Sequence, residues 1–125
     1  AYWAALRAEP DNLTAIEKTV QGMAESLRQP ERFQEFDANF HFEIARATQN
    51  KILFRLINVI RGQIQTWIGE RLTLSSDRTE ALAEISLNQH REVLAAIISG
   101  DGDAARDAMD RHIQTATRDL RGIAK

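Results

Sequence analysis

Cysteine is absent from the sequence and proline is scarce. Without cysteine, the chain can form no disulfide, no thiolate metal site and no cysteine nucleophile. The two prolines, Pro10 and Pro30, both lie where the sequence pattern indicates a boundary between helices. Strand signals are missing too, because neither alternating β-branched residues nor Asn-Gly turns occur. These absences favour a helical protein.

Long apolar runs are also lacking. A helix needs roughly 18–20 apolar residues to span a bilayer, whereas the densest apolar stretch, Ile52–Ile60, is interrupted by Arg55 and Asn58. The first residues do not combine a basic region with an apolar run, so they do not resemble a signal peptide. We therefore expect a cytoplasmic protein without membrane contact.

Neither sign of charge predominates. The chain has 16 basic and 18 acidic residues and a formal net charge of −2. The arginines are interleaved with acids, as on solvated helix faces, and form no basic patch for nucleic acid. The 125 residues, 43% of them hydrophobic, are enough for one domain with its own core. The chain begins without methionine in what reads as the middle of a helix, so we expect a fragment of a longer protein.

Apolar residues recur at spacings of three and four, which is the period of amphipathic helices. Caps and breakers divide this pattern into about six helices joined by short loops, which predicts an all-α, antiparallel bundle. The predicted segments are residues 1–8, a helix capped by Asp11 that ends near residue 29, a helix that begins at Pro30, residues 51–73 after an Asn50 cap, residues 78–99 before Gly100, and a last helix capped by Asp101 or Asp103.

The inward faces of these helices follow from the same spacing. Residues 51–73 have the widest apolar sector, so we expect that helix to be central. The predicted core stripes of the third, fifth and sixth helices are Phe33, Phe36, Phe40, Ile44 and Ala47; then Leu82, Ile85, Val93, Leu94 and Ile97; then Ala105, Met109, Ile113, Ala116 and Leu120.

Four polar residues fall within or beside these stripes. Asp37 and His41 lie four residues apart on one face of the third helix, and His90 and His112 lie on the inward faces of the fifth and sixth. A carboxylate aimed into a core needs a cation, and three imidazoles with one carboxylate suit a borderline divalent metal. The alternative is that each histidine is a core residue satisfied by one hydrogen bond, with Asp37 and His41 as a simple i,i+4 pair.

Two blocks of the sequence resemble a known family. They read Phe36-Asp37-x-x-Phe40-His41-x-x-Ile44-Ala45-x-Ala47-x-x-Asn50 and His90-x-x-x-Leu94-x-Ala96-Ile97-x-x-Gly100-Asp101, the second followed by Ala105-x-x-x-Met109-x-x-His112. The chain is similar over residues 1–125 to the C-terminal effector-binding domain of FadR-type GntR transcription regulators, the FCD domain. Most of the family's first helix and its N-terminal winged helix-turn-helix domain are missing here.

The resemblance implies a function for the four polar residues. In that family the corresponding residues bind one divalent metal, which assigns Asp37, His41, His90 and His112 as its ligands. Zinc is our first choice, and nickel, manganese and iron accept the same set. The resemblance further implies a small organic acid as effector (a hydroxy, keto or sugar acid), a homodimer, and DNA binding only through the missing N-terminal domain.

An acid bound at such a metal needs further contacts. Four protein ligands on an octahedral ion leave two positions, which a carboxylate and an adjacent hydroxyl or carbonyl oxygen can fill. Arg71, at the centre of the fourth helix's apolar sector, or Arg61 at its edge could hold the remaining negative charge. The alternative is that both arginines extend to solvent. Gln65 and Asn88 are weaker candidates for effector contacts.

Two other functions compete with a sensor. A mononuclear metalloenzyme would need a general base near the metal, and the sequence offers no further acid or histidine on the inward stripes and no His-Glu-x-x-His motif. A metal-free structural or dimerisation bundle would leave the four residues as core polar groups. We expect the sensor, and no enzymatic activity.

Overall fold

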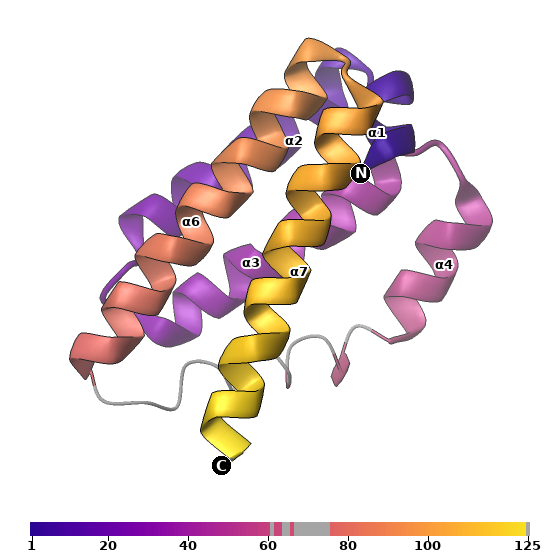
Figure 1. The fold of residues 1–125 in the computed structure, drawn as a ribbon. Helices are drawn as coiled ribbons and strands as arrows, with labels where there is room; N and C mark the ends of the chain where they lie inside the picture. Colours follow the sequence, from indigo (N-terminus) through magenta and orange to yellow (C-terminus); the bar gives the residue numbers. More distant parts are fainter. Residues whose placement is uncertain (61, 64–65, 67–75, 125) are drawn as a thin grey trace.

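The computed structural model describes residues 1–60, 62–63, 66 and 76–124, with side chains for all of these except 76–79 and 116–124. In these residues every element is a helix, which confirms the all-α prediction (Figure 1). The helices are α1 (Tyr2–Arg7), α2 (Pro10–Glu25), α3 (Pro30–Ala47), α4 (Lys51–Val59), α6 (Ser76–Ser99) and α7 (Gly102–Ala124).

Two helical hairpins form the bundle. Helix α2 packs along α3 through the connection at residues 26–29, and α6 packs along α7 through residues 100–101. Helix α1 contacts α3, α6 and α7, and α2 also contacts α6 (Figure 1). Such short connections make neighbouring helices antiparallel, as the sequence predicted. The largest apolar side chains buried between the helices are Ile16, Met23, Phe33, Phe40, Val93 and Ile97.

Local sequence signals set most of the helix ends. Pro30 occupies the first turn of α3, where its missing N–H is no loss. Asn50 caps α4, because its Oδ1 accepts hydrogen bonds from the backbone N–H groups of Ile52 and Leu53, each at 3.1 Å. Asp101 Oδ1 accepts one from Ala104 N–H at 3.1 Å in the first turn of α7. These three boundary predictions are confirmed.

The turn between α6 and α7 also agrees with the sequence, whereas the start of α2 does not. Gly100 has φ +75°, a left-handed conformation that favours glycine after a helix. The predicted cap Asp11 is wrong, because α2 begins at Pro10 and Glu9 is its N-cap. Asn12 Oδ1 accepts the hydrogen bond of Glu9 N–H at 2.9 Å, so an amide one turn inside the helix satisfies this end.

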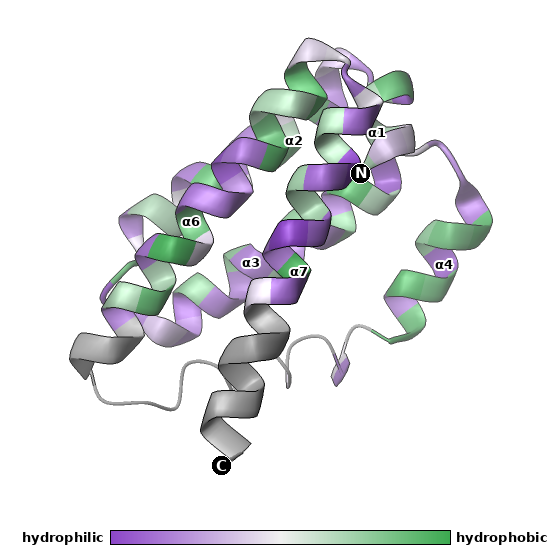
Figure 2. Cartoon of the chain, viewed as in Figure 1, coloured by the Kyte–Doolittle hydropathy of each residue, from purple (hydrophilic) through white to green (hydrophobic). Residues whose placement is uncertain are grey.

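The prediction of a central fourth helix is wrong for its described residues, and most of its predicted extension over residues 61–73 lies outside the described residues. Helix α4 ends at Val59, and Ile60 is its C-cap residue. It lies at the edge of the bundle beside α3 (Figure 1), and Figure 2 shows it as largely hydrophobic. Ile52, Leu56 and Val59 are 80%, 57% and 82% exposed. The apolar pattern predicted burial, but the described residues do not cover this face.

Two predicted core residues also lie at the surface. Ile85 on α6 and Ile113 on α7 are 46% and 45% exposed. The buried faces of these helices combine alanines, among them Ala83, Ala105 and Ala108, with larger residues such as Val93 and Ile97. The predictions of Val93, Ile97 and Ala105 as core residues are confirmed, whereas the buried Ala83 and Ala108 were not predicted.

A close contact between α2 and α3 gives a testable prediction. Gly22 is buried on α2, and a Cβ placed there would overlap the ring of Phe36 on α3. Alanine inside a helix normally stabilises relative to glycine by about 0.5–1 kcal/mol, but overpacking costs about 1–3 kcal/mol. We expect Gly22→Ala to lower the free energy of unfolding in urea titrations. In Gly62→Ala, where no described atom lies within 4 Å of the new Cβ, we expect no loss of unfolding free energy. Equal changes in the two variants would contradict the clash between a Cβ at Gly22 and Phe36.

Candidate metal centre

Three helices bring four potential ligands together in the core. Asp37 and His41 lie on adjacent turns of α3, His90 on α6 and His112 on α7, and one ligand atom from each lies within 4.8 Å of the others. Asp37, His90 and His112 are at most 1% exposed, while the side chain of His41 is 17% exposed. The predicted convergence of the four residues is therefore present, and His41 lies nearest to solvent.

The Asp37 carboxylate is only half satisfied. Its Oδ1 lies 2.7 Å from His90 Nε2, within hydrogen-bond distance, and 3.3 Å from His41 Nε2. Its Oδ2 is buried without a hydrogen-bond partner among the described residues, and so is His41 Nε2. A buried carboxylate oxygen without a partner is unfavourable by about 1–3 kcal/mol or more. This atom is the feature of the cluster that most clearly calls for a cation.

Opposing effects act on the ionisation of Asp37. Burial raises the pKa of its carboxyl, but the positive charge of His90, the hydrogen bond from His90 and the nearby His41 imidazole lower it. The two histidines outweigh the effect of burial, so the pKa of Asp37 lies well below the usual 3.8. Asp37 is therefore a carboxylate, the form that binds metals.

The imidazole rings are packed against one another and against Phe40. The ring centroids of His90 and His112 are 4.3 Å apart, and His41 stacks on His112 at 5.6 Å with an angle of 11° between the planes. Phe40 makes an edge-to-face contact with His90, and the two ring centroids are 4.4 Å apart. Because Phe40 is fully buried, one side of the cluster is apolar, and charges there interact more strongly than in water.

Two contacts outside the cluster hold the rings, and the sequence reasoning missed both. His90 Nδ1 lies 2.5 Å from the backbone carbonyl oxygen of Ser86, and His112 Nδ1 lies 2.8 Å from Gln89 Oε1. In each ring Nδ1 faces an acceptor outside the cluster, so Nε2 is the ring nitrogen on the cluster side. In His90 this Nε2 donates to Asp37 Oδ1, and a metal bound there would take the place of that proton. The i,i+4 spacing of Ser86 and His90 was a usable signal. No spacing rule links Gln89 to His112 across the hairpin.

The donor set fits a divalent metal of borderline softness. Imidazole nitrogens and a carboxylate oxygen are the ligands that zinc and its neighbours take in proteins. With ligands about 2.1 Å from an ion, opposite ligand atoms lie about 4.2 Å apart, so a cluster within 4.8 Å needs only a small contraction. Asp37, His41, His90 and His112 could therefore hold one ion together.

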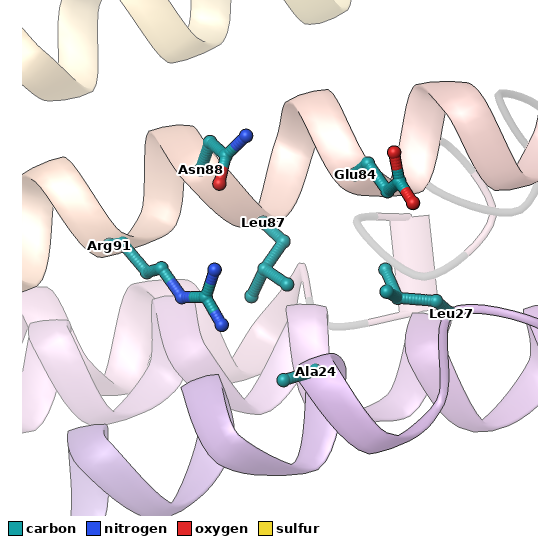
Figure 3. Close-up of a pocket in the computed structure, with 6 residues that line it drawn as sticks. All are labelled: Ala24, Leu27, Glu84, Leu87, Asn88 and Arg91. Atoms are coloured by element: carbon teal, nitrogen blue, oxygen red, sulfur yellow. The ribbon is translucent and has the colours of Figure 1, made fainter.

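Of the four predicted effector contacts, the described residues include one, Asn88. Arg61, Gln65 and Arg71 lie outside the described residues. Asn88 is exposed on α6, two residues and thus about 200° around the helix from His90. It lines a hollow of about 230 Å³ between α2 and α6 (Figure 3). Its role in effector binding stays a prediction.

That hollow is an open surface feature, distinct from the metal cluster. Figure 3 shows Arg91 and Leu87 extending from α6 towards α2. Its lining residues are Ala24, Leu27, Glu84, Leu87, Asn88 and Arg91. As for membranes, among the described helices none has the length and apolar character required to cross a bilayer.

Comparisons with known proteins identify relatives over nearly the whole chain. The family model of the FCD domain matches residues 1–115. The galactonate operon transcriptional repressor of Escherichia coli K12 is 31% identical over 98% of this chain and 52% of the repressor. The putative L-lactate dehydrogenase operon regulatory protein of the same organism is 30% identical over 90% and 43%.

A third relative, the Uxu operon transcriptional regulator of E. coli K12, is 29% identical over 96% of this chain and 48% of its own length. The chain thus spans about half the length of the curated relatives it matches. Their names are those of transcription regulators, which agrees with the prediction of a regulatory domain and not an enzyme.

Proposed function

This chain belongs to the FCD domain family, and on that premise we propose that it senses a small organic acid through a divalent metal held by Asp37, His41, His90 and His112. The observation that carries the proposal is the convergence of four donors from three helices around a buried carboxylate oxygen without a partner. Zinc is the first choice, with nickel, manganese or iron as alternatives.

The names of the relatives support a hydroxy acid as effector. One relative is named for a galactonate operon and another for an L-lactate dehydrogenase operon. Galactonate and lactate both carry a hydroxyl group next to the carboxylate. A bound divalent ion with two positions left by four protein ligands supplies coordination for such a pair of oxygens. His90, His112 and the Asp37 carboxylate would hold such an ion from within the bundle.

In our proposal the signal passes through helix packing. The ligands belong to α3, α6 and α7, so an acid that favours one arrangement of these helices shifts the population of the whole bundle towards it. The effector must bind the two arrangements with different affinities for this to occur. A separate N-terminal domain, in a homodimer of the full-length protein, would convert the shift into altered DNA binding.

One observation favours a second candidate, a metal-free structural bundle. The 2.7 Å contact between His90 Nε2 and Asp37 Oδ1 is a satisfied buried ion pair without any metal. The unpartnered Oδ2 of Asp37 argues against it. Elemental analysis of the purified chain separates the two candidates.

The test combines metal content with acid binding. We expect about one divalent ion per chain, lost in His90→Ala/His112→Ala and retained in Asp103→Asn, whose side chain is 77% exposed. In calorimetric titrations, L-lactate and D-galactonate should bind the metal-loaded chain, and propionate, which lacks the hydroxyl, should bind more weakly. If the wild type takes up no ion after reloading with zinc, nickel or manganese, the metal-free bundle is correct. If acids bind equally with and without metal, the effector does not bind at the ion.

A further inference from the structure

A chain of three hydrogen bonds leads from His112 to the backbone of α7. His112 Nδ1 lies 2.8 Å from Gln89 Oε1, Gln89 Nε2 donates to Thr115 Oγ1 at 3.0 Å, and the Thr115 hydroxyl donates to the carbonyl oxygen of Arg111 at 2.9 Å. Gln89 lies on α6, and the other three residues lie on α7. The side-chain amide therefore bridges the hairpin next to the metal cluster.

The direction of this chain is determined by proton counting. The Thr115 hydroxyl has one hydrogen, which it donates to the Arg111 carbonyl, so Oγ1 can only accept from Gln89. The group that faces Thr115 must then be the amide NH2 of Gln89, and its carbonyl oxygen must face His112. A carbonyl oxygen accepts only, so the proton of His112 lies on Nδ1. The lone pair of Nε2 is thereby left for the cluster.

We propose that Gln89, oriented by Thr115, is a positioning residue that holds His112 in the tautomer and orientation required for metal binding. This inference rests on the proposed metal site. It adds Gln89 and Thr115 as residues that set the affinity of that site for its metal ion. His90 differs from His112, because its Nδ1 faces a backbone carbonyl, that of Ser86. A side-chain substitution at position 86 keeps that acceptor. Loss of the Ser86 hydroxyl, which lies 3.3 Å from His90 Nδ1, leaves the closer backbone carbonyl in place, whereas substitution of Gln89 removes the acceptor that faces His112 Nδ1.

Substitutions of Gln89 and Thr115 should change affinity in a graded way. Removal of a hydrogen-bond partner of a metal-ligating histidine typically weakens metal binding by about 10–100-fold. We expect Gln89→Leu, which removes the acceptor, to lie in this range for cobalt. We expect Thr115→Val to cause a smaller loss, because the amide can then rotate. Gln89→Glu keeps an acceptor for Nδ1–H, and Thr115→Ser keeps the hydroxyl, so both should bind cobalt nearly as the wild type does.

The test has one readout that does not involve metal. Nitrogen-15 NMR of the imidazole rings in the chelator-treated chain should find the His112 proton on Nδ1 in the wild type and in Thr115→Ser, and redistributed between the two nitrogens in Gln89→Leu. Cobalt titrations followed by visible absorption then give the affinities. Circular dichroism and urea unfolding check that each variant is folded.

Each outcome decides between the two proposals. A His112 proton on Nε2 in the wild type, or cobalt affinity in Gln89→Leu equal to that of the wild type, overturns the role of Gln89 and leaves the metal site intact. A wild-type chain that binds no cobalt overturns the metal site and this role with it. If Gln89→Leu does not fold, Thr115→Val with its matched Thr115→Ser decides the question through the same two readouts.

Discussion

Zinc at about a thousand times its dissociation constant is expected to raise the melting temperature of this domain by about 12–20 °C. An ion that binds only the folded state adds about 4 kcal/mol to the free energy of unfolding at that concentration. For a domain of this size, 1 kcal/mol corresponds to a shift of about 3–5 °C. Binding is confined to the folded state because the four ligands belong to three helices and meet only when the bundle forms.

The control for this experiment removes the ligands from α6 and α7. His90→Ala/His112→Ala should melt at the same temperature with zinc and with chelator, and chelator should reverse the shift in the wild type. Differential scanning calorimetry measures both. An equal shift in the double variant would mean that zinc binds elsewhere on the chain.

The second large effect concerns the metal-free protein. Asp37→Ala is expected to lower the free energy of unfolding by about 3–5 kcal/mol, the usual result of breaking a buried ion pair by removing one partner. The substitution leaves His90 Nε2 without the carboxylate that lies 2.7 Å away. Urea unfolding in the presence of chelator measures the loss. Asp103→Ala, at an exposed carboxylate, should change the free energy by less than about 0.5 kcal/mol.

This loss depends on pH in a defined direction. The pKa of Asp37 is lowered in the folded chain, so its contribution to stability is fully present above the unfolded pKa of about 3.9. It is lost as the pH falls below that value towards the lowered pKa of the folded state. The gap between wild type and Asp37→Ala should therefore shrink under acid. A gap that stays constant as the pH falls through this window would show that Asp37 contributes through packing alone.

The inward positions of Asp37, His41, His90 and His112 were largely predictable because they depend on helical periodicity. The spacing of Phe33 and Phe40 defined the buried face of α3, and that face contains Asp37. Short connections made antiparallel hairpins, which brought His90 and His112 to the same level of the bundle. Periodicity says which side of a helix faces inward, so it identified these four residues as inward-facing, and the family resemblance was needed to assign them to one site.

The spacing of apolar residues mispredicted burial at positions where burial requires a second helix to cover the face. The apolar face of α4 predicted a central helix, yet Leu56 is 57% exposed, because burial requires a covering partner that an isolated pattern cannot reveal. Ala105 and Ile113 were both predicted inward; Ala105 is buried, whereas Ile113 is 45% exposed. The contact of Gln89 with His112 was also beyond reach, since it depends on the register between α6 and α7.

The distance along the chain between ligands affects how long the folded state lasts. Asp37 and His90 are 53 residues apart in sequence, so the site is completed only when distant parts of the chain have met, which is a late event in folding. Interactions that form after the transition state slow unfolding and leave the folding rate nearly unchanged. Occupancy of the proposed site by a metal would thus lengthen the lifetime of the folded domain.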